Sequence, residues 1–424
     1  MDNSNTSPFL RPAQTSLQSL GRLKIQLTQS ERLIPIPGAT VRIASAGNPD
    51  QIIEELSTDS SGQTQTISVS APSRDYSLEP QAAQPYSEYT ITVSAPGYET
   101  TVVSGTQVLS GETSIQNIRL KQQSTTPSNA IVILPHTLYY EYPPKIAEAE
   151  IKPIGESGEI VLSRVVVPET IIVHTGPPGD VNAPNYYIPY RDYIKNVASS
   201  EIYATWPEST ITANILAIIS FTLNRVYTEW YRNQGFNFTI TSSTAYDHAF
   251  VYGRNIYENI SQIVDNIFAN YLSRPNVRQP ILTQYCDGSR VTCPGWMSQW
   301  GSKTLGDQGY TPIEILQYYY GDSIFINSAP QIAGIPSSWP GTNLTQGSSG
   351  DKVLQIQEQL NRIADNYPAI PKILADGIYG SDTANSVRIF QQVFDLPVTG
   401  VVDYSTWYKI SQIYVGVTRI AELN

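Results

Sequence analysis

The sequence predicts a multidomain α+β protein with an N-terminal β-sandwich, a central mixed α+β domain and a C-terminal module of three helices. Its 424 residues exceed what a single hydrophobic core usually supports. Apolar residues recur with a period of two before residue 120 and with a helical period after residue 350. Polar or Pro/Gly-rich stretches at 121–130 and 334–343 divide the chain between these regions.

The N-terminal region predicts a flexible pre-segment at 1–20 and a sandwich at 21–122. Residues 1–20 are polar and lack periodicity. Short alternating stretches, separated by turn residues, follow at 21–29, 38–45, 63–71, 89–98 and 113–120. This pattern resembles prealbumin-like and carboxypeptidase-regulatory-like modules. It contains no group of side chains suited to catalysis.

A polar stretch, KQQSTTPSNA at 121–130, predicts a cleavable linker at 123–131. It contains one Pro and no apolar anchor, and stretches of this kind are preferred sites of proteolysis. The candidate cleavage positions are Lys121, Gln122, Gln123, Ser124, Asn129 and Ala130.

The central domain is expected at 132–333. Apolar runs predict strands within 130–140 and 159–176. Helical spacing predicts helices at 190–234 and 255–272, and a shorter helix at 311–321 carries Pro312 in its first turn.

Three motifs in this domain resemble the stage II sporulation protein D family. They are YIKNVASSEIYATWP at 193–207, STAYDHAFVYG at 243–253 and GWMSQWGSKTLGDQGYTPIEILQYYYG at 295–321. Members of this family are lytic transglycosylases that cleave peptidoglycan. The resemblance implies a catalytic domain with the same activity here, and it implies that Glu201 is the catalytic acid.

The chemistry of such an enzyme requires one carboxylic acid. This acid protonates the glycosidic oxygen and then accepts the proton of the sugar's own C6 hydroxyl, whereas ordinary glycosidases need two carboxyl groups. It has to be protonated near neutral pH, so its pKa must be raised by apolar surroundings. Four neighbours of Glu201 in the sequence could supply them: Val197, Ile202, Tyr203 and Trp206.

The resemblance also implies that Tyr285, Ser298 and Gln299 contact the substrate or orient the acid, and Asp247 is a fourth candidate. Simple packing is the alternative for the first three. Asp247 is a rival second carboxylate that would permit hydrolysis, although a structural hydrogen bond is the role we favour for it. Glu208 follows a Trp-Pro pair, so we expect it to stabilise the start of a helix.

Both cysteines, Cys286 and Cys293, lie in YCDGSRVTCPGWMSQWG at 285–301, which we expect to shape the sugar-binding cleft. Members of the sporulation family carry a His, able to help bind zinc, where this chain has Cys293. No His lies in this stretch, so neither a zinc site nor a nucleophilic cysteine is favoured. A disulfide that closes a short loop and two reduced thiols are the alternatives left open.

The C-terminal region, 334–424, contains GSSGDKVLQIQEQLN at 347–361 and DGIYGSDTANSVRIFQQVFDLPVTGVVDYSTW at 376–407. These stretches resemble the peptidoglycan-binding repeat of cell-wall hydrolases. We expect the core of this module to contain Val387, Phe390 and Trp407. Binding would then fall to groups near the turn at 376–383, and the candidates are Asp376, Gly377, Tyr379 and Gly380.

The composition excludes several classes of function. A net charge of −11 without a basic patch argues against nucleic acid and anionic membranes. The sequence contains no apolar run of membrane-spanning length and no recognisable secretory signal. We expect a monomer without metal or cofactor.

The order of regions over the whole chain resembles the precursors of clostridial spore cortex-lytic enzymes. The resemblance implies a zymogen that is made in the mother cell, deposited in the cortex or coat region of the spore and activated at germination by a subtilisin-like protease. It also implies cortex peptidoglycan as substrate, with the MurNAc-GlcNAc β-1,4 bond cleaved to 1,6-anhydro ends. The alternatives are an N-acetylglucosaminidase-type hydrolase and a non-catalytic spore wall-binding or structural protein.

Overall fold

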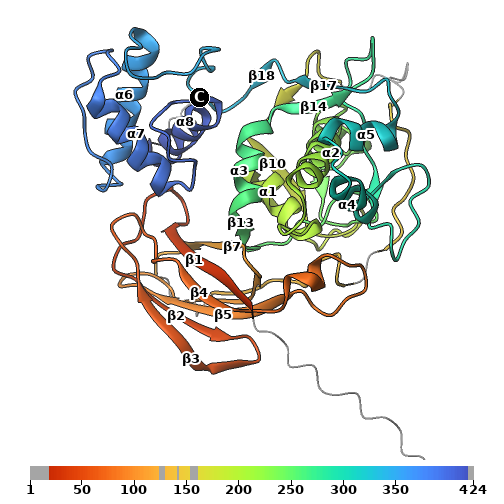
Figure 1. Ribbon diagram of the computed structural model, residues 1–424, viewed down its shortest axis with the longest axis horizontal. Helices are drawn as coiled ribbons and strands as arrows, with labels where there is room; N and C mark the ends of the chain where they lie inside the picture. The colour runs from red at the N-terminus through yellow and green to blue at the C-terminus, as the bar shows by residue number, and fades with distance from the viewer. Residues whose placement is uncertain (1–18, 124–128, 141–142, 153–160, 419–424) are drawn as a thin grey trace, which may run out of the picture.

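The computed structural model describes residues 19–123, 129–140, 143–152 and 161–418, which form three lobes (Figure 1). They are a β-sandwich, a mixed α+β domain and a smaller lobe of helices at the C-terminal end. The described residues contain eight α-helices and six sheets, so the mixed α+β class is confirmed. The flexible pre-segment expected at 1–20 lies outside the described residues, apart from Ser19 and Leu20, which begin the first strand.

The sandwich packs a four-stranded sheet against a five-stranded sheet, with the strand orders β13-β7-β1-β4 and β3-β2-β5-β6-β8. Alternation buries one face of each strand, as in β1, where Leu23, Ile25 and Leu27 are fully buried. The strands before the expected linker are β1 (Ser19–Gln29), β2 (Thr40–Ser45), β3 (Asn48–Ser57), β4 (Ile67–Ala71), β5 (Tyr86–Ser94), β6 (Thr101–Leu109) and β7 (Thr113–Leu120), and a 3-10 helix, η1, spans Arg74–Ser77.

Each sheet of the sandwich also contains a strand from the chain that follows the linker. Strand β8 (Asn129–Val132) pairs in parallel with β6, and β13 (Ile256–Tyr257) pairs antiparallel with β7. The linker predicted at 123–131 is therefore too long at its C-terminal end, because Asn129 and Ala130 already belong to β8. Ser124 lies outside the described residues, whereas the chain at 121–123 is exposed.

Helix α2 (Glu208–Tyr227) is the centre of the middle lobe. Its sequence is apolar around most of its circumference, and most of its residues are buried. Four helices pack around it: α1 (Tyr190–Glu201), α3 (Glu258–Ile267), α4 (Gln299–Asp307) and α5 (Pro312–Tyr320). The short strands of this lobe are β9 (Val166–Val167), β10 (Thr170–His174), β11 (Asn185–Pro189), β12 (Ile240–Thr241), β14 (Asn270–Ser273), β15 (Tyr285–Cys286), β16 (Met297–Ser298), β17 (Phe325–Ser328) and β18 (Gln331–Ile332), with a second 3-10 helix, η2, at Arg232–Gln234.

Several elements are shorter than the sequence predicted. The helix expected at 190–234 is interrupted at 202–207, so α1 ends at Glu201 and α2 begins after Pro207. The helix expected at 255–272 contains only α3, because pairing with other strands turns its two ends into β13 and β14. The strand expected at 130–140 ends at Val132.

The C-terminal lobe consists of α6 (Asp351–Ala364), α7 (Ser381–Val393) and α8 (Tyr404–Thr418). Two glutamines hold its turns in the same way. Gln357 accepts a hydrogen bond from the backbone of Gly377, and Gln391 accepts one from Gly400, both at 2.8 Å. Both glycines have positive φ angles, 73° and 71°, which explains glycine at each turn. The core predicted from the sequence is observed: Val387, Phe390 and Trp407 are fully buried.

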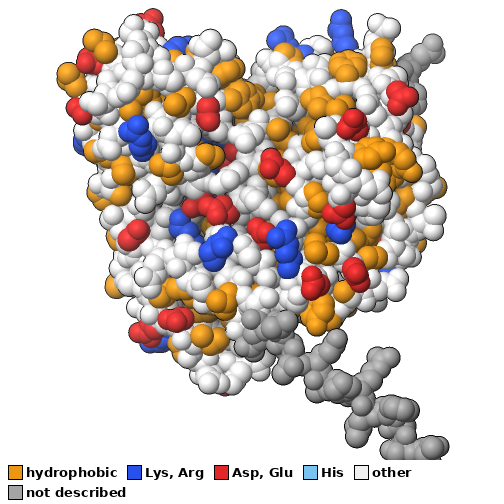
Figure 2. Space-filling view, viewed as in Figure 1, with side chains coloured by type: hydrophobic (Ala, Val, Ile, Leu, Met, Phe, Trp, Pro, Cys, Tyr) orange, Lys and Arg blue, Asp and Glu red, His pale blue; other side chains and the backbone are white. Residues whose placement is uncertain are grey.

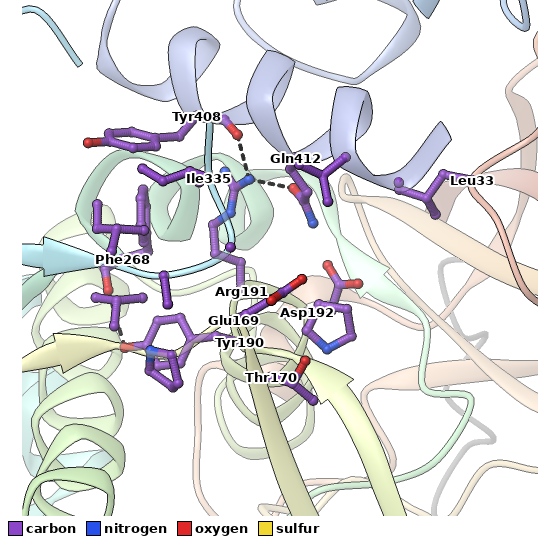
Figure 3. A pocket seen from close by; sticks show the side chains of 18 of the residues that line it. Leu33, Glu169, Thr170, Tyr190, Arg191, Asp192, Phe268, Ile335, Tyr408 and Gln412 are labelled. Atoms are coloured by element: carbon purple, nitrogen blue, oxygen red, sulfur yellow. Dashed lines mark hydrogen bonds between the residues drawn. The ribbon is translucent and has the colours of Figure 1, made fainter. Parts of the chain in front are cut away.

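The three lobes meet around a cavity of about 300 Å³. In the space-filling view, acidic and basic side chains gather near the middle of the face, where the lobes meet (Figure 2). Arg191, at the start of α1, points from the middle lobe into α8 and donates to the carbonyl of Tyr408 at 2.8 Å and to Gln412 at 2.6 Å (Figure 3). The sandwich also holds the helical lobe, through an ion pair of 2.7 Å between Lys24 and Asp395. Across the described ranges, every helix is too short or too polar to span a bilayer.

Candidate active site

Glu201 is the last residue of α1 and is fully buried. The backbone N–H of Ala249 donates to one carboxyl oxygen at 2.5 Å, and the Tyr285 hydroxyl donates to the other. The side chain of Gln299 donates to the backbone carbonyl of Glu201 at 3.2 Å. The structure therefore brings Glu201, from the motif at 193–207, together with Tyr285 and Gln299, which both lie in the stretch 285–301.

The surroundings of Glu201 favour the protonated form of its carboxyl group. Burial raises the pKa of Glu201 above its ordinary value, because removing a carboxylate from water is costly. The positive charge of Lys145 and the hydrogen bonds from Ala249 and Tyr285 lower the pKa and so oppose this effect. A carboxyl group with a raised pKa can donate a proton near neutral pH, as a general acid must.

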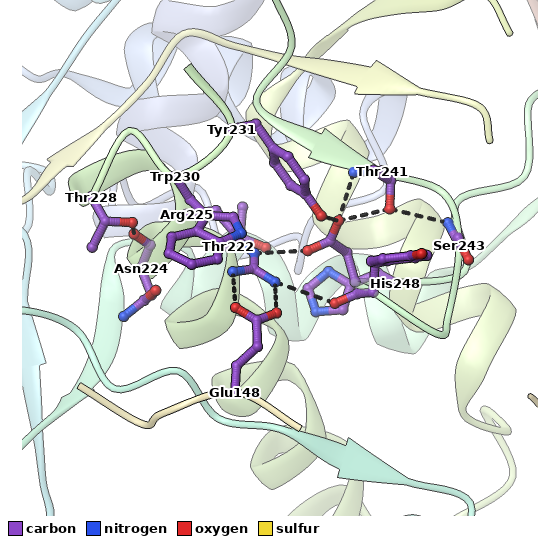
Figure 4. A network of polar contacts seen from close by, with 12 residues as sticks. Glu148, Thr222, Asn224, Arg225, Thr228, Trp230, Tyr231, Thr241, Ser243 and His248 are labelled. Carbon is purple, nitrogen blue, oxygen red and sulfur yellow. Dashed lines mark hydrogen bonds and ion pairs between the residues drawn. The ribbon is translucent and has the colours of Figure 1, made fainter. Parts of the chain in front are cut away.

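Asp247, the rival carboxylate, accepts hydrogen bonds at both of its oxygens, and its partners Arg225, Tyr231 and Thr241 are labelled in Figure 4. Arg225 donates to one oxygen at 2.7 Å. The other oxygen accepts from the Tyr231 hydroxyl at 2.6 Å and from the backbone and hydroxyl of Thr241 at 2.9 and 2.7 Å. Asp247 thereby fixes the loop that presents Ala249 to Glu201. These contacts fit a structural role and leave no carboxylate oxygen free to activate water.

Ser298 plays a different part from Tyr285 and Gln299. Its hydroxyl accepts a hydrogen bond from the backbone of Gly301 at 2.9 Å and so caps α4. Its strand, β16, pairs in parallel with β15, which contains Tyr285. Ser298 therefore helps to position the strand beside the acid without a described hydrogen bond to Glu201.

Cys286 and Cys293 are joined in a disulfide that closes the loop between them. Inside the loop, the buried carboxylate of Asp287 accepts hydrogen bonds from the backbone of Arg290 at 3.1 Å and Val291 at 3.0 Å. Zinc does not fit these residues, because both sulfurs are bonded to each other and cannot serve as thiolate ligands. Among the described residues, no group of three or more His, Cys, Asp or Glu side chains is arranged to hold a metal.

The sandwich covers the loop that follows Glu201. Arg74 donates to the carbonyl of Thr205 at 2.6 Å, and the indole of Trp206 donates to the carbonyl of Ser77 at 2.8 Å. A cavity of about 230 Å³ lies at this junction. Its walls come from the sandwich on one side and from the middle lobe on the other: Tyr76, Glu79, Gln81, Ala82 and Ala83 face Leu138, Tyr139, Tyr203, Ser289, Arg290 and Trp300.

The end of α1 is also covered by the segment 133–140, which follows β8 and which we call the strap. The backbone N–H and the hydroxyl of Thr137 both donate to the carbonyl of Ser200, at 3.2 and 3.0 Å. The ring of His136 stacks on Tyr203 at 4.5 Å, and its backbone N–H donates to the hydroxyl of Tyr86 in the sandwich at 3.1 Å. The strap thus lies over the end of α1 and touches the sandwich at the same time.

Sequence reasoning missed two groups of the site. Ala249 acts through its backbone, and only its place in the STAYDHAFVYG motif pointed to it. Lys145 carries no sequence signal, because it stands alone in a proline-rich stretch outside every motif. Its ammonium nevertheless lies 5.1 Å from the centre of the Tyr285 ring.

The turn predicted to bind glycan is only partly exposed. Tyr379 is buried and its hydroxyl donates to the carbonyl of Gly400 at 2.9 Å, so it belongs to the core of the module. Gly377 is buried as well, whereas Asp376 and Gly380 are exposed. Ile378 is an exposed apolar residue in the same turn, and the sequence pattern did not single it out.

Comparison with known families identifies the helical lobe. Residues 349–410 match the family model described as "Putative peptidoglycan binding domain". The match supports peptidoglycan as a binding partner and a cell-wall-associated role for the chain. No curated protein matches the chain significantly.

Similar solved structures cover only parts of the chain. The N-terminal domain of SleB is 26% identical over 18% of this chain and 99% of that chain, with a TM-score of 0.16. The minor pilin of Streptococcus agalactiae is 17% identical over 26% of this chain and 47% of that chain, with a TM-score of 0.18. A mutant catechol 1,2-dioxygenase of Acinetobacter radioresistens is 16% identical over 26% of this chain and 55% of that chain, also with a TM-score of 0.18.

Proposed function

We propose that the protein is the zymogen of a spore cortex-lytic enzyme, a lytic transglycosylase that cleaves cortex peptidoglycan with Glu201 as its acid. The observation that carries the proposal is a single buried carboxyl group, with a raised pKa, that is held by a tyrosine hydroxyl and a backbone N–H. The peptidoglycan-binding family match at 349–410 supports the choice of polymer.

The proposed reaction uses Glu201 twice. The acid first protonates the oxygen of the MurNAc-GlcNAc bond, and the C1–O bond to the leaving sugar breaks. The resulting carboxylate then accepts the proton of the MurNAc C6 hydroxyl while this oxygen bonds to C1. A 1,6-anhydro end forms, no water is consumed and Glu201 regains its proton.

Two alternatives have to be weighed against this reaction. Hydrolysis of the N-acetylglucosaminidase type would need a second group to activate water. Asp247, the rival carboxylate, already accepts hydrogen bonds at both of its oxygens. A non-catalytic wall-binding protein is consistent with the family match and with the complete burial of Glu201.

The burial of Glu201 supports the proposal of a zymogen. The sandwich and the strap cover the end of α1, and β8 connects the strap directly to the sandwich sheet. Cleavage between 121 and 128 by the proposed subtilisin-like germination protease would allow the sandwich to dissociate. The strap would then lose β6 and Tyr86 as partners, and the loop after Glu201 would open to the glycan.

The replacement Glu201→Gln tests the proposal. In cut protein incubated with decoated spore cortex, we expect a loss of about 10²- to 10⁴-fold in glycan cleavage, because the amide cannot donate the proton. Mass spectrometry of the wild-type products should find 1,6-anhydro ends. The matched control is Glu208→Gln, an exposed carboxylate at the start of α2, which should keep wild-type activity.

The outcomes separate the three functions. Near wild-type activity of Glu201→Gln would reject the assignment of the acid. Reducing ends without the anhydro form would support a hydrolase. Absence of any cleavage by the wild-type protein, cut or intact, would leave wall binding as the function.

A further inference from the structure

Lys145 is a buried lysine whose charge is not matched by the carboxylates bonded around it. It lies in the segment 143–152, which is fixed to the Asp247 loop by a backbone hydrogen bond of 2.7 Å from Ile146 to Ala245. Its ammonium donates to the backbone carbonyl of Asp247 and lies 5.1 Å from the ring centres of both Phe221 and Tyr285. A buried ammonium is costly unless an anion compensates it.

The carboxylates bonded in this network have other partners (Figure 4). Arg225 binds both oxygens of Glu148, at 2.9 and 2.6 Å, and it binds Asp247 at 2.7 Å. Lys152 makes a second ion pair with Glu148. No described contact joins the ammonium of Lys145 to either carboxylate.

The His248 ring lies beside both rings that face Lys145, and it is hydrogen-bonded to Tyr193. Burial keeps the pKa of His248 well below its ordinary value, and the charges of Lys145 and Arg225 lower it further, so the ring is uncharged. Burial likewise raises the pKa of Tyr193 well above its ordinary value. Glu201 is therefore the carboxyl group that can become an anion near Lys145 when it loses its proton. Both residues contact Tyr285, Glu201 at its hydroxyl and Lys145 at its ring face.

We propose that Lys145 is a positioning residue whose ammonium stabilises the carboxylate that Glu201 becomes when it gives up its proton. This inference rests on the proposed function of Glu201. The carboxylate forms in a site that excludes water, where a fixed positive charge is worth more than it would be in solution. Lys145 would thereby help the first proton transfer and hold Glu201 ionised until the C6 hydroxyl returns a proton.

The electrostatic balance of the pair agrees with this role. Among charged groups, Lys145 has the largest effect on the pKa of Glu201, and Glu201 has the largest effect on the pKa of Lys145. Burial lowers the pKa of Lys145 to about 8, while Glu201, Asp247 and Glu148 act in the opposite direction. The ammonium is therefore still charged at neutral pH. It keeps the pKa of Glu201 from rising as far as burial alone would take it.

The test compares Lys145→Met, Lys145→Arg and the matched control Lys152→Met in cut protein acting on decoated cortex. Lys152 is a buried lysine of the same network, but it faces Glu148 and the Trp230 ring. We expect Lys145→Met to lower kcat about 100-fold. The alkaline limb of its pH–rate profile should move up by about one to three pH units, because Glu201 loses its neighbouring cation.

The two other variants show whether the charge of Lys145 causes the shift of the alkaline limb. Lys145→Arg keeps a cation and should keep the alkaline limb of the wild type, and Lys152→Met should leave the limb unmoved. An unchanged limb in Lys145→Met, or the same upward shift in Lys152→Met, would overturn the inference. If Lys145→Met does not fold, an upward shift of the alkaline limb in Lys145→Arg would overturn it as well.

This experiment can fail without the proposed function failing. An inactive Glu201→Gln variant combined with a wild-type profile for Lys145→Met would reject only the role of Lys145. An active Glu201→Gln variant would reject the acid itself. The infrared band of a protonated carboxyl, present in the wild-type full chain and absent in Glu201→Gln, can also be titrated. Its midpoint should rise in Lys145→Met whether or not the protein has been cut.

Discussion

Asp265 illustrates how single buried charges hold this protein together. It lies on α3 and forms ion pairs with two residues of α1, Arg191 at 3.2 Å and Lys195 at 2.7 Å. Burial would raise the pKa of Asp265, but the charges of Lys195, Lys409 and Arg191 outweigh burial and lower it to about 2. Because Arg191 also bonds α8, this carboxylate stabilises the contact between the middle and C-terminal lobes.

Asp265 should make stability depend on pH in the acid range. Its folded pKa lies below the unfolded value of 3.8, so its contribution is complete above pH 3.8 and is lost as the pH falls towards 2. The loss should amount to about 2 kcal/mol. Urea unfolding between pH 6 and pH 2 should show this loss in the wild type and not in Asp265→Asn, which should also be several kcal/mol less stable at pH 6. Asp365→Asn, an exposed ion-pair carboxylate, is the control and should behave like the wild type.

The disulfide loop should be only moderately sensitive to loss of its bridge. The combined change Cys286→Ser and Cys293→Ser should lower the free energy of unfolding by about 2 to 3 kcal/mol at most, because the bridge closes a short loop. Asp287 would still hold the loop backbone. Chemical denaturation measures the change. Stoichiometric zinc in the purified protein that disappears in the double variant would contradict the disulfide assignment.

At the scale of elements, the periodic segments could be predicted and those formed by tertiary pairing could not. The helix at 351–364 follows from the apolar spacing of Val353, Ile356 and Leu360, all of which are fully buried. Strand β3 was missed because it is an exposed edge without alternation. Strand β13 was missed because its two residues lie in a helical pattern and become a strand only through pairing with β7.

The candidate site, too, could be predicted from the sequence only in part. Glu201 and Gln299 could be placed together because they belong to motifs that imply a shared site, and Tyr285 was a candidate in the same stretch as Gln299. Lys145 and the strap could not, since Lys145 carries no local pattern and the strap was predicted as a strand. Both take their positions from partners more than 50 residues away in the sequence. Long-range contacts of this kind are decided by the fold as a whole.

At the scale of the whole molecule, the sandwich is bound to the middle lobe by more than the linker. The amide of Asn255 accepts from the backbone N–H of Gln107 and donates to its carbonyl, both at 2.9 Å, beside the pairing of β13 with β7. Strand β8 adds a second sheet contact on the other side. A cut at 121–128 breaks none of these interactions.

We therefore expect protein cut within 121–128 to elute at first as a complex of two pieces in gel filtration. Its activity on decoated cortex should rise only as the sandwich leaves, whereas the intact chain should stay inactive. Asn255→Ala removes both bonds to Gln107 and should speed the release several-fold. Asn259→Ala, which removes a bond to Ala204 instead, should not. Equal activity of intact and cut chains would contradict the zymogen.

Because strand β8 stays paired with β6 after the cut, cleavage turns an intramolecular contact between the sandwich and the site into a bimolecular one. Before the cut, the sandwich meets the site as part of one chain, at an effective concentration in about the millimolar range. Afterwards the same surfaces form a bimolecular complex, whose occupancy depends on dilution. The specific activity of cut protein should then fall as its concentration rises.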